Sequence, residues 1–165
     1  MSETFTARVW VLGDDIDTDI IIPTEYLALK TVQDMTPYAF SPLRPELAAQ
    51  IQPCDVIVAG KNFGCGSSRE QAPEIIKALG IKAVIAKSFA RIFYRNSINN
   101  GLLLIENADL HDAVTEGDII EVTVGEKIAA NGKTYEIASL PENLLEILNA
   151  GGLVRAMRKR NGLED

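Results

Sequence analysis

The chain has 165 residues, 47% of them hydrophobic, and a formal net charge of -7 at pH 7. This length suits one domain with a core of its own, and the acidic balance excludes a general nucleic-acid binder, which needs a basic face. No apolar run approaches the roughly 18 residues of a membrane-spanning helix, so the sequence gives no support for a membrane role.

The N-terminus and the cysteines indicate a reducing compartment. The N-terminus lacks the basic stretch, apolar stretch and cleavage site of an exported protein, so we expect a cytoplasmic protein in which Cys54 and Cys65 are reduced. Two cysteines are too few for a four-cysteine metal or iron-sulfur site within one chain. We therefore expect that this chain alone binds no metal and no cofactor.

The first third of the chain combines short elements with a long irregular segment. Residues 7–12 predict a strand, and an acidic turn, GDDIDTD at residues 13–19, precedes a second short strand at residues 20–22. Weak periodicity and recurring prolines predict that residues 24–53 are irregular, with one short helix. Long segments of this kind often carry function.

The middle of the chain alternates strands with helices. Strands are predicted at residues 55–59, 81–86 and 102–105, with helices between them at about 72–79 and 89–99. The first of these helices has apolar residues at i, i+3, i+4 and i+7 and ends at Gly80. Such alternation favours right-handed crossovers and a parallel sheet.

The last third has a different pattern. Strands are predicted at residues 119–124 and 135–138, with Asn131-Gly132 as the hairpin turn between them, and a helix starts near Pro141. A cationic cluster near the C-terminus suits the last turn of a helix better than a nucleic-acid site: Arg155, Arg158, Lys159 and Arg160. The predicted fold class is therefore α/β, with one domain over residues 1–165 and a small antiparallel section.

The stretch KNFGCGSSRE, residues 61–70, joins a predicted strand to the helix that follows it. Gly64 and Gly66 let a ligand approach the backbone, and Ser67 with Glu70 fits a capping box at the helix start. The unpaired N–H groups of a helix N-terminus attract anions, and the Arg69 guanidinium suits a carboxylate or phosphate. The predicted ligand is an anion.

The residues alone leave several roles open for this turn. It lacks the third glycine of a dinucleotide fingerprint and the Gly-Lys-Ser/Thr of a phosphate-binding loop. In the plainest interpretation Ser67 only caps the helix and the glycines only turn the chain. A hydroxyl at a positive helix end beside a guanidinium ionises more easily, however, so Ser67 or Ser68 is also a candidate base or nucleophile.

Two other groups are weaker candidates. Asp15, Asp17 and Asp19 resemble the start of a calcium loop, but Ile20 stands where that loop requires glycine, which excludes a calcium hand. His111 is the only histidine, and we expect it at a solvated helix start and not at a catalytic centre.

Four stretches carry a resemblance to a known family: GDDIDTDIIIP (residues 13–23), VAGKNFGCGSSREQAP (58–73), AKSFARIFYRNSINNGLLLIE (86–106) and NAGGL (149–153). In this order, and nearly end to end, they resemble the small subunits of 3-isopropylmalate dehydratase in the aconitase family, in the short form of archaea and many bacteria. The resemblance implies a single swivelling β/β/α domain like the aconitase C-terminal domain. It also implies a separate large subunit, which carries a 4Fe-4S cluster.

The family implies a reaction and a set of site residues. Its members isomerise 2-isopropylmalate and 3-isopropylmalate by dehydration and rehydration in leucine biosynthesis, as heterodimers or heterotetramers with an aconitase-like large subunit. By the matching motif, Ser67 is the base, and Ser68, Arg69 and Gly66 bind substrate oxygens. The loop that discriminates the substrate's side group corresponds to Tyr26, Leu27, Ala28, Leu29, Lys30 and Thr31.

Two departures from the family pattern leave alternatives open. Gln71 stands where many members have histidine, and the loop after Leu27 differs from the usual isopropylmalate form. Isopropylmalate is the first expected substrate, before homoaconitate, dimethylmalate or methylmalate-type hydroxy acids. Leu27, Leu29 and Val32 suit an isopropyl or methyl group, whereas Lys30 either reaches an extra carboxylate or points to solvent. The alternative from another class is a non-catalytic module that holds a metabolite anion for regulation.

Overall fold

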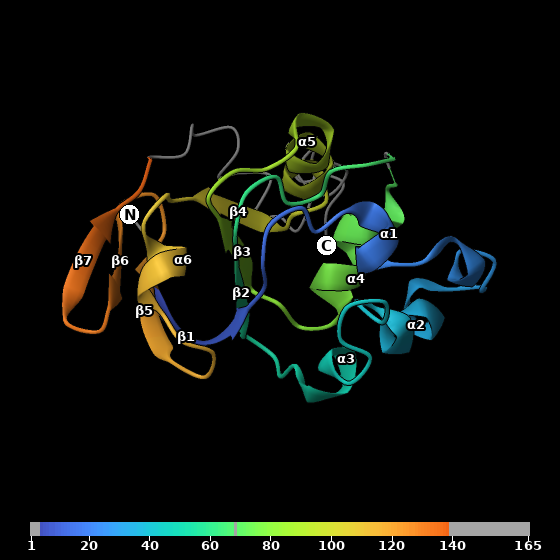
Figure 1. The fold of residues 1–165 in the computed structure, drawn as a ribbon, viewed down its shortest axis with the longest axis horizontal. Helices are drawn as coiled ribbons and strands as arrows, with labels where there is room; N and C mark the ends of the chain where they lie inside the picture. The colour runs from blue at the N-terminus through green and yellow to red at the C-terminus, as the bar shows by residue number, and fades with distance from the viewer. Residues whose placement is uncertain (1–3, 68, 139–165) are drawn as a thin grey trace, which may run out of the picture.

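The computed structural model describes residues 4–67 and 69–138, and their centre is a seven-stranded sheet (Figure 1). The order of its strands is β4-β3-β2-β1-β5-β6-β7. Their bounds are β1 (Thr4–Val11), β2 (Val56–Ala59), β3 (Ala83–Ala86), β4 (Leu103–Glu106), β5 (Ile119–Thr123), β6 (Lys127–Ala130) and β7 (Lys133–Glu136).

The sheet has a parallel half and an antiparallel half that share β1. Strands β1 to β4 pair in parallel, whereas β5 pairs with β1, β6 with β5 and β7 with β6 in antiparallel fashion. This agrees with the predicted parallel core and small antiparallel section. The prediction missed β6, however. Asn131 and Gly132, both at positive φ, form a tight turn as predicted, but this turn joins β6 to β7 and not the two predicted strands.

The helical elements are mostly short. They are α1 (Thr18–Ile21), η1 (Thr24–Tyr26), α2 (Val32–Met35), η2 (Thr36–Tyr38), α3 (Leu47–Gln50), α4 (Gln71–Ala78), α5 (Arg91–Asn99) and α6 (Leu110–Ala113). The segment 24–53 therefore holds two α-helices and two 3₁₀ turns, where one short helix was predicted.

The predicted strand at residues 20–22 is wrong, because α1 occupies this position. The Asp17 carboxylate accepts a hydrogen bond of 2.9 Å from the Ile20 backbone N–H and so caps the first turn of the helix. A local cap of this kind outweighs the strand preference of three consecutive isoleucines.

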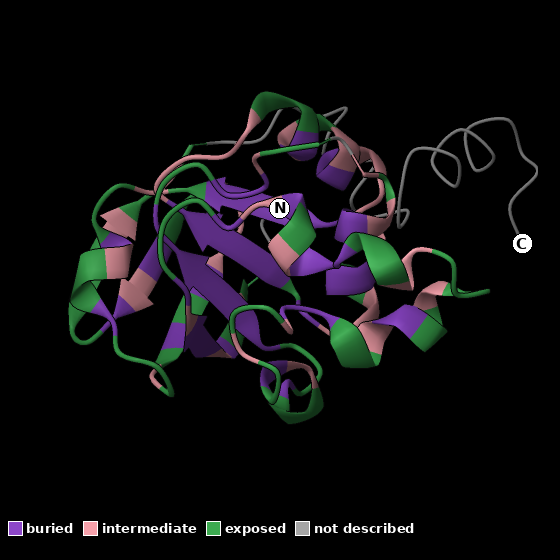
Figure 2. Ribbon diagram, turned by 45° about the vertical axis from the view of Figure 1, so that its right-hand side comes forward, coloured by how far each residue is buried: buried purple, intermediate pink, exposed green. Residues whose placement is uncertain are grey.

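Apolar side chains cover both faces of the parallel half, and Figure 2 shows its strands as buried. Ile57, Val84 and Leu104 belong to the core cluster that also contains buried side chains of α4 and α5. Their neighbours along the strands face the other cluster, where Leu110 of α6 lies. Burial on both faces explains why β2 and β3 are uninterrupted apolar runs.

Several sequence predictions concern segments outside the described residues. These are the helix near Pro141, the motif at residues 149–153 and the cations at residues 155–160. Within residues 4–67 and 69–138, none of the helices combines the length and the apolar composition of a membrane-spanning helix.

Candidate functional site

The glycine-rich turn follows β2 and is joined by backbone hydrogen bonds to the acidic turn that follows β1. The Gly64 N–H donates to the Ile16 carbonyl at 2.7 Å, and the Thr18 N–H donates to the Cys65 carbonyl at 2.9 Å. The buried Thr18 hydroxyl donates to the Ser67 carbonyl at 2.7 Å. Because the carboxyl ends of parallel strands meet at one edge of a sheet, the fold itself brings these two turns together.

The other side of the turn is fixed by the loop after β3 and by α5. The Phe63 N–H donates to the Ser88 carbonyl at 3.1 Å, and the Ala90 N–H donates to the Phe63 carbonyl at 2.9 Å. The Phe63 ring packs edge-on against Phe93 of α5. Gly64 lies at φ 85°, and a Cβ added there would lie 2.1 Å from the Phe93 ring. The close approach of α5 therefore requires glycine at this position.

Ser67 has a fixed backbone and an accessible side chain. The predicted capping box is wrong, because α4 begins only at Gln71, and its N-cap residue Glu70 makes no side-chain capping bond. The Ser67 side chain is exposed, and its hydroxyl makes no hydrogen bond to another described residue. The hydroxyl is thus available for chemistry and is not used to start the helix. Ser68 lies outside the described residues.

Arg69 contacts the segment between α1 and η1. Its Nη1 donates to the Ile22 carbonyl at 2.8 Å, and its Nη2 donates to the Thr24 hydroxyl at 2.7 Å and forms an ion pair with Asp19. Only 13% of the side chain is exposed. The guanidinium fork, expected to meet a ligand anion, therefore holds oxygens of its own chain in this structure.

The predicted specificity loop, residues 26–31, begins two residues after Thr24, which Arg69 binds. Thr24 is the first residue of η1, and the Tyr26 ring stacks on Tyr38 with a centroid distance of 4.0 Å. Leu27 packs against the core, whereas Leu29 is 37% exposed and Lys30 is exposed. The other two predicted residues, Ala28 and Thr31, are also exposed, and Thr31 caps α2.

The thiol within the turn is a poor nucleophile. Partial burial raises the pKa of Cys65, and the carboxylates of Asp17 and Asp15 raise it further. The thiol form therefore dominates at neutral pH, and only a thiolate is reactive. The residues that the structure describes also contain no cluster of three or more His, Cys, Asp or Glu side chains suited to a metal ion.

His111 is less solvated than predicted. It lies in α6, but its ring is half-buried and its Nε2 is 2.8 Å from the Leu12 carbonyl at the end of β1. The ring thus links α6 to β1 in a structural role.

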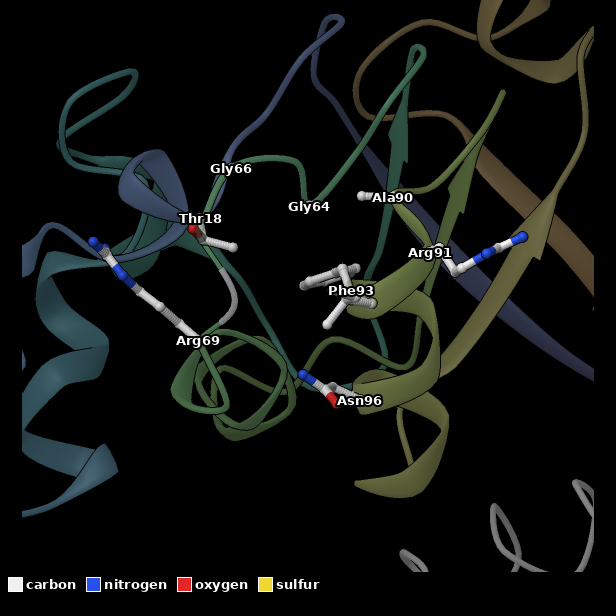
Figure 3. Close-up of a pocket in the computed structure, with 9 residues that line it drawn as sticks. Thr18, Gly64, Gly66, Arg69, Ala90, Arg91, Phe93 and Asn96 are labelled. Atoms are coloured by element: carbon white, nitrogen blue, oxygen red, sulfur yellow. The ribbon is translucent and has the colours of Figure 1, made fainter.

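A pocket of about 290 Å³ opens between the turn and α5 (Figure 3). Asn96 points from α5 towards this space, whereas the Arg69 and Arg91 side chains extend away from it on opposite sides. The lining residues are Thr18, Gly64, Gly66, Arg69, Ala90, Arg91, Ile92, Phe93 and Asn96. Apolar groups of α5 form one wall, and the backbone of the turn forms the other.

Comparison with known proteins decides the family. The aconitase C-terminal domain matches residues 21–110, which include the glycine-rich turn and the loop beside Arg69. A 3-isopropylmalate dehydratase small subunit of Lachnospira eligens is 81% identical over 99% of this chain and all of that protein. The chain belongs to this branch of the aconitase family.

Two more distant relatives agree with this assignment. The isopropylmalate/citramalate isomerase small subunit of Methanocaldococcus jannaschii is 45% identical over 97% of each chain. The crystal structure of a 3-isopropylmalate dehydratase from the same organism covers 98% of this chain and 97% of its own, with a TM-score of 0.91 and 44% identity. The α/β fold of the aconitase C-terminal domain, expected from the sequence, is thereby confirmed.

Sequence reasoning missed three groups of this aconitase-type site. Thr18 holds the Ser67 carbonyl, Asp19 pairs with Arg69, and Phe93 packs against Gly64. The acidic turn and the helix that carry these residues belong to the stretches that resemble the family. The individual contacts join residues about 25 to 50 positions apart and could be assigned only once the sheet had brought the loops together.

Proposed function

We propose that this chain is the small subunit of a cytoplasmic hydro-lyase that interconverts 2-isopropylmalate and 3-isopropylmalate in leucine biosynthesis. It works with an aconitase-like large subunit, which holds a 4Fe-4S cluster. The observation that carries this proposal is the 81% identity, over almost the whole chain, to a protein of that name. The accessible Ser67 hydroxyl, on a backbone fixed by Thr18, supports it.

Ser67 is the proposed base. In the dehydration, its ionised oxygen takes a proton from the carbon next to the one that bears the hydroxyl, the electrons of that C–H bond form the double bond, and the hydroxyl leaves as hydroxide. In the rehydration, hydroxide adds to the carbon that lost the proton, and Ser67 returns its proton to the carbon that first bore the hydroxyl. The partner's cluster supplies a Lewis acid for the substrate hydroxyl.

Arg69 and Gly66 are the proposed substrate-binding groups beside this base, together with Ser68. The guanidinium binds a substrate carboxylate and holds it next to the turn. In this chain without its partner, Asp19 already forms an ion pair with Arg69. A substrate carboxylate that enters the site therefore competes with Asp19 for the guanidinium. The Gly66 N–H group provides a further donor for a substrate oxygen.

The loop of residues 26–31 is the proposed wall for the side group of the substrate. Leu29 is a large apolar side chain that this loop exposes, and it suits an isopropyl or methyl group. A methylmalate-type substrate is the second candidate, because the relative at 45% identity carries citramalate in its name.

Anaerobic reconstitution with the large subunit tests this function. We expect the isolated chain to be inactive and the mixture to turn over isopropylmalate faster than citramalate, dimethylmalate or homoaconitate. Turnover by this chain alone, free of partner, would contradict the shared site. Tight anion binding without any turnover in the complex would favour the regulatory module instead.

A further inference from the structure

The exposed face of α5 carries two basic residues, whereas the chain as a whole is acidic. The chain has a net charge of -7, yet α5 presents Arg91 and Arg95 one turn apart on its surface. Neither arginine makes an ion pair or a hydrogen bond with another described residue. Between them lies Ile92, which is 57% exposed and has the second-highest exposure among the large exposed apolar side chains of the described part.

This face is continuous with the candidate active site. Arg91 and Ile92 line the pocket of about 290 Å³, whose opposite wall is formed by Gly64 and Gly66 of the glycine-rich turn. Phe93 of the same helix packs against Gly64, so α5 has a fixed position relative to the turn. Gly66, the neighbour of Ser67 in the chain, lines the same pocket, so the pocket joins this end of α5 to the turn that carries the proposed base (Figure 3).

We propose that Arg91, Ile92 and Arg95, together with the pocket beside them, form the docking surface for an acidic and apolar patch of the large subunit. This inference rests on the proposed function, because it assigns the occupant to the partner that completes the active site. Two guanidinium groups that have no acidic partner among the described residues are suited to bind carboxylates of the large subunit. An apolar side chain of the partner packs against Ile92 on the α5 side of the pocket, which leaves the side with Gly66 and Arg69 to the substrate.

The affinity of the full-length chain for the purified large subunit tests this surface. We expect the double variant Arg91→Glu, Arg95→Glu to bind about 10-fold to 100-fold more weakly than the wild type, because like charges then face each other. The matched control is Lys127→Glu, Lys133→Glu, which changes the net charge equally on exposed positions of β6 and β7. The control should bind within about twofold of the wild type, since surface charges at a distance are screened by salt.

Two milder variants separate the docking role from a loss of folding. Arg91→Gln, Arg95→Gln should reduce both the affinity and its dependence on salt, whereas Ile92→Ala should reduce the affinity at every salt concentration. Saturating large subunit should restore the wild-type kcat in each folded variant. A kcat that stays low at saturation would overturn the proposal, because these residues would then act on the substrate.

The remaining outcomes are equally decisive. If the wild-type chain neither associates with the large subunit nor becomes active, the proposed function fails. If the wild-type complex forms and turns over, but the glutamate variant binds as the wild type does, only the docking surface is wrong. Dissociation of a dimer of this chain by the same variant, with unchanged affinity for the large subunit, would assign the surface to a second copy.

Discussion

The glycine-rich turn carries Arg69, and the segment of residues 24–31 begins at Thr24, which Arg69 binds. The backbones of these two regions are fixed in different ways. Bonds of the turn reach residues far away in the sequence, such as Gly64 to Ile16 and Ser67 to Thr18. Bonds of the loop are local, such as Leu27 to Thr24 and Leu29 to Tyr26. The backbone of the turn is thus bonded to distant parts of the chain, whereas these backbone bonds of the loop are local.

This difference suggests how chemistry and selectivity are divided. A change within the turn disturbs contacts with the acidic turn after β1, the loop after β3 and α5 together, so few replacements are tolerated there. In the loop, Tyr26 and Leu27 pack against the core, whereas residues 28–31 are exposed. Exposed loop residues such as Leu29 can be replaced while the glycine-rich turn stays in place.

The replacement Ser67→Ala should have the largest effect on activity. We expect kcat of the reconstituted enzyme to fall by about 100-fold to 10,000-fold, because the proposed base is lost. Stability and affinity for the large subunit should stay near wild type, since the exposed hydroxyl makes no bond to another described residue. Steady-state kinetics and thermal melting check both parts. Near-normal turnover would move the proton-transfer role to another residue.

The replacement Gly64→Ala tests whether the turn depends on the whole fold. We expect a loss of about 2 to 5 kcal/mol in the free energy of unfolding, because alanine is strained at φ 85° and its Cβ would collide with Phe93. Gly13→Ala is the control, since a Cβ at Gly13 meets no atom within 4 Å and should change stability by less than about 0.5 kcal/mol. Equal small effects in urea titrations would show that the α5 contact is not rigid.

The same contrast between distant and local contacts explains what the sequence could predict. Strands β2 and β3 and helix α4 were found because their apolar periods are strong and local. The motif proposed Ser67 and Arg69 as site residues, but it could not indicate that Asp19 and Thr24 hold the guanidinium. The capping box was misread because a Ser-x-x-Glu pattern fits both a helix start and a turn that precedes the helix by several residues.

The replacement Arg69→Lys tests the point where the two regions meet. An ammonium cannot reproduce the fork to Ile22 and Thr24, so we expect kcat/KM to fall by about 10-fold to 100-fold, mainly through a higher KM. Arg44→Lys is the matched control, because Arg44 makes a similar two-pronged contact with Glu116 away from the turn. It should change stability but not KM. Equal effects of the two variants on KM would remove Arg69 from substrate binding.

The smallest expected effect belongs to Lys30→Ala in the loop. Lys30 is exposed and has no hydrogen-bond or ion-pair partner among the described residues. If the loop accepts an apolar side group through Leu29, the loss of the Lys30 charge leaves kcat/KM for isopropylmalate within about twofold, since discrimination rests on pocket contacts. The value for homoaconitate should change by the same small factor. A loss confined to homoaconitate would place Lys30 against a third carboxylate and make the loop a charged wall, with the turn and its chemistry unchanged.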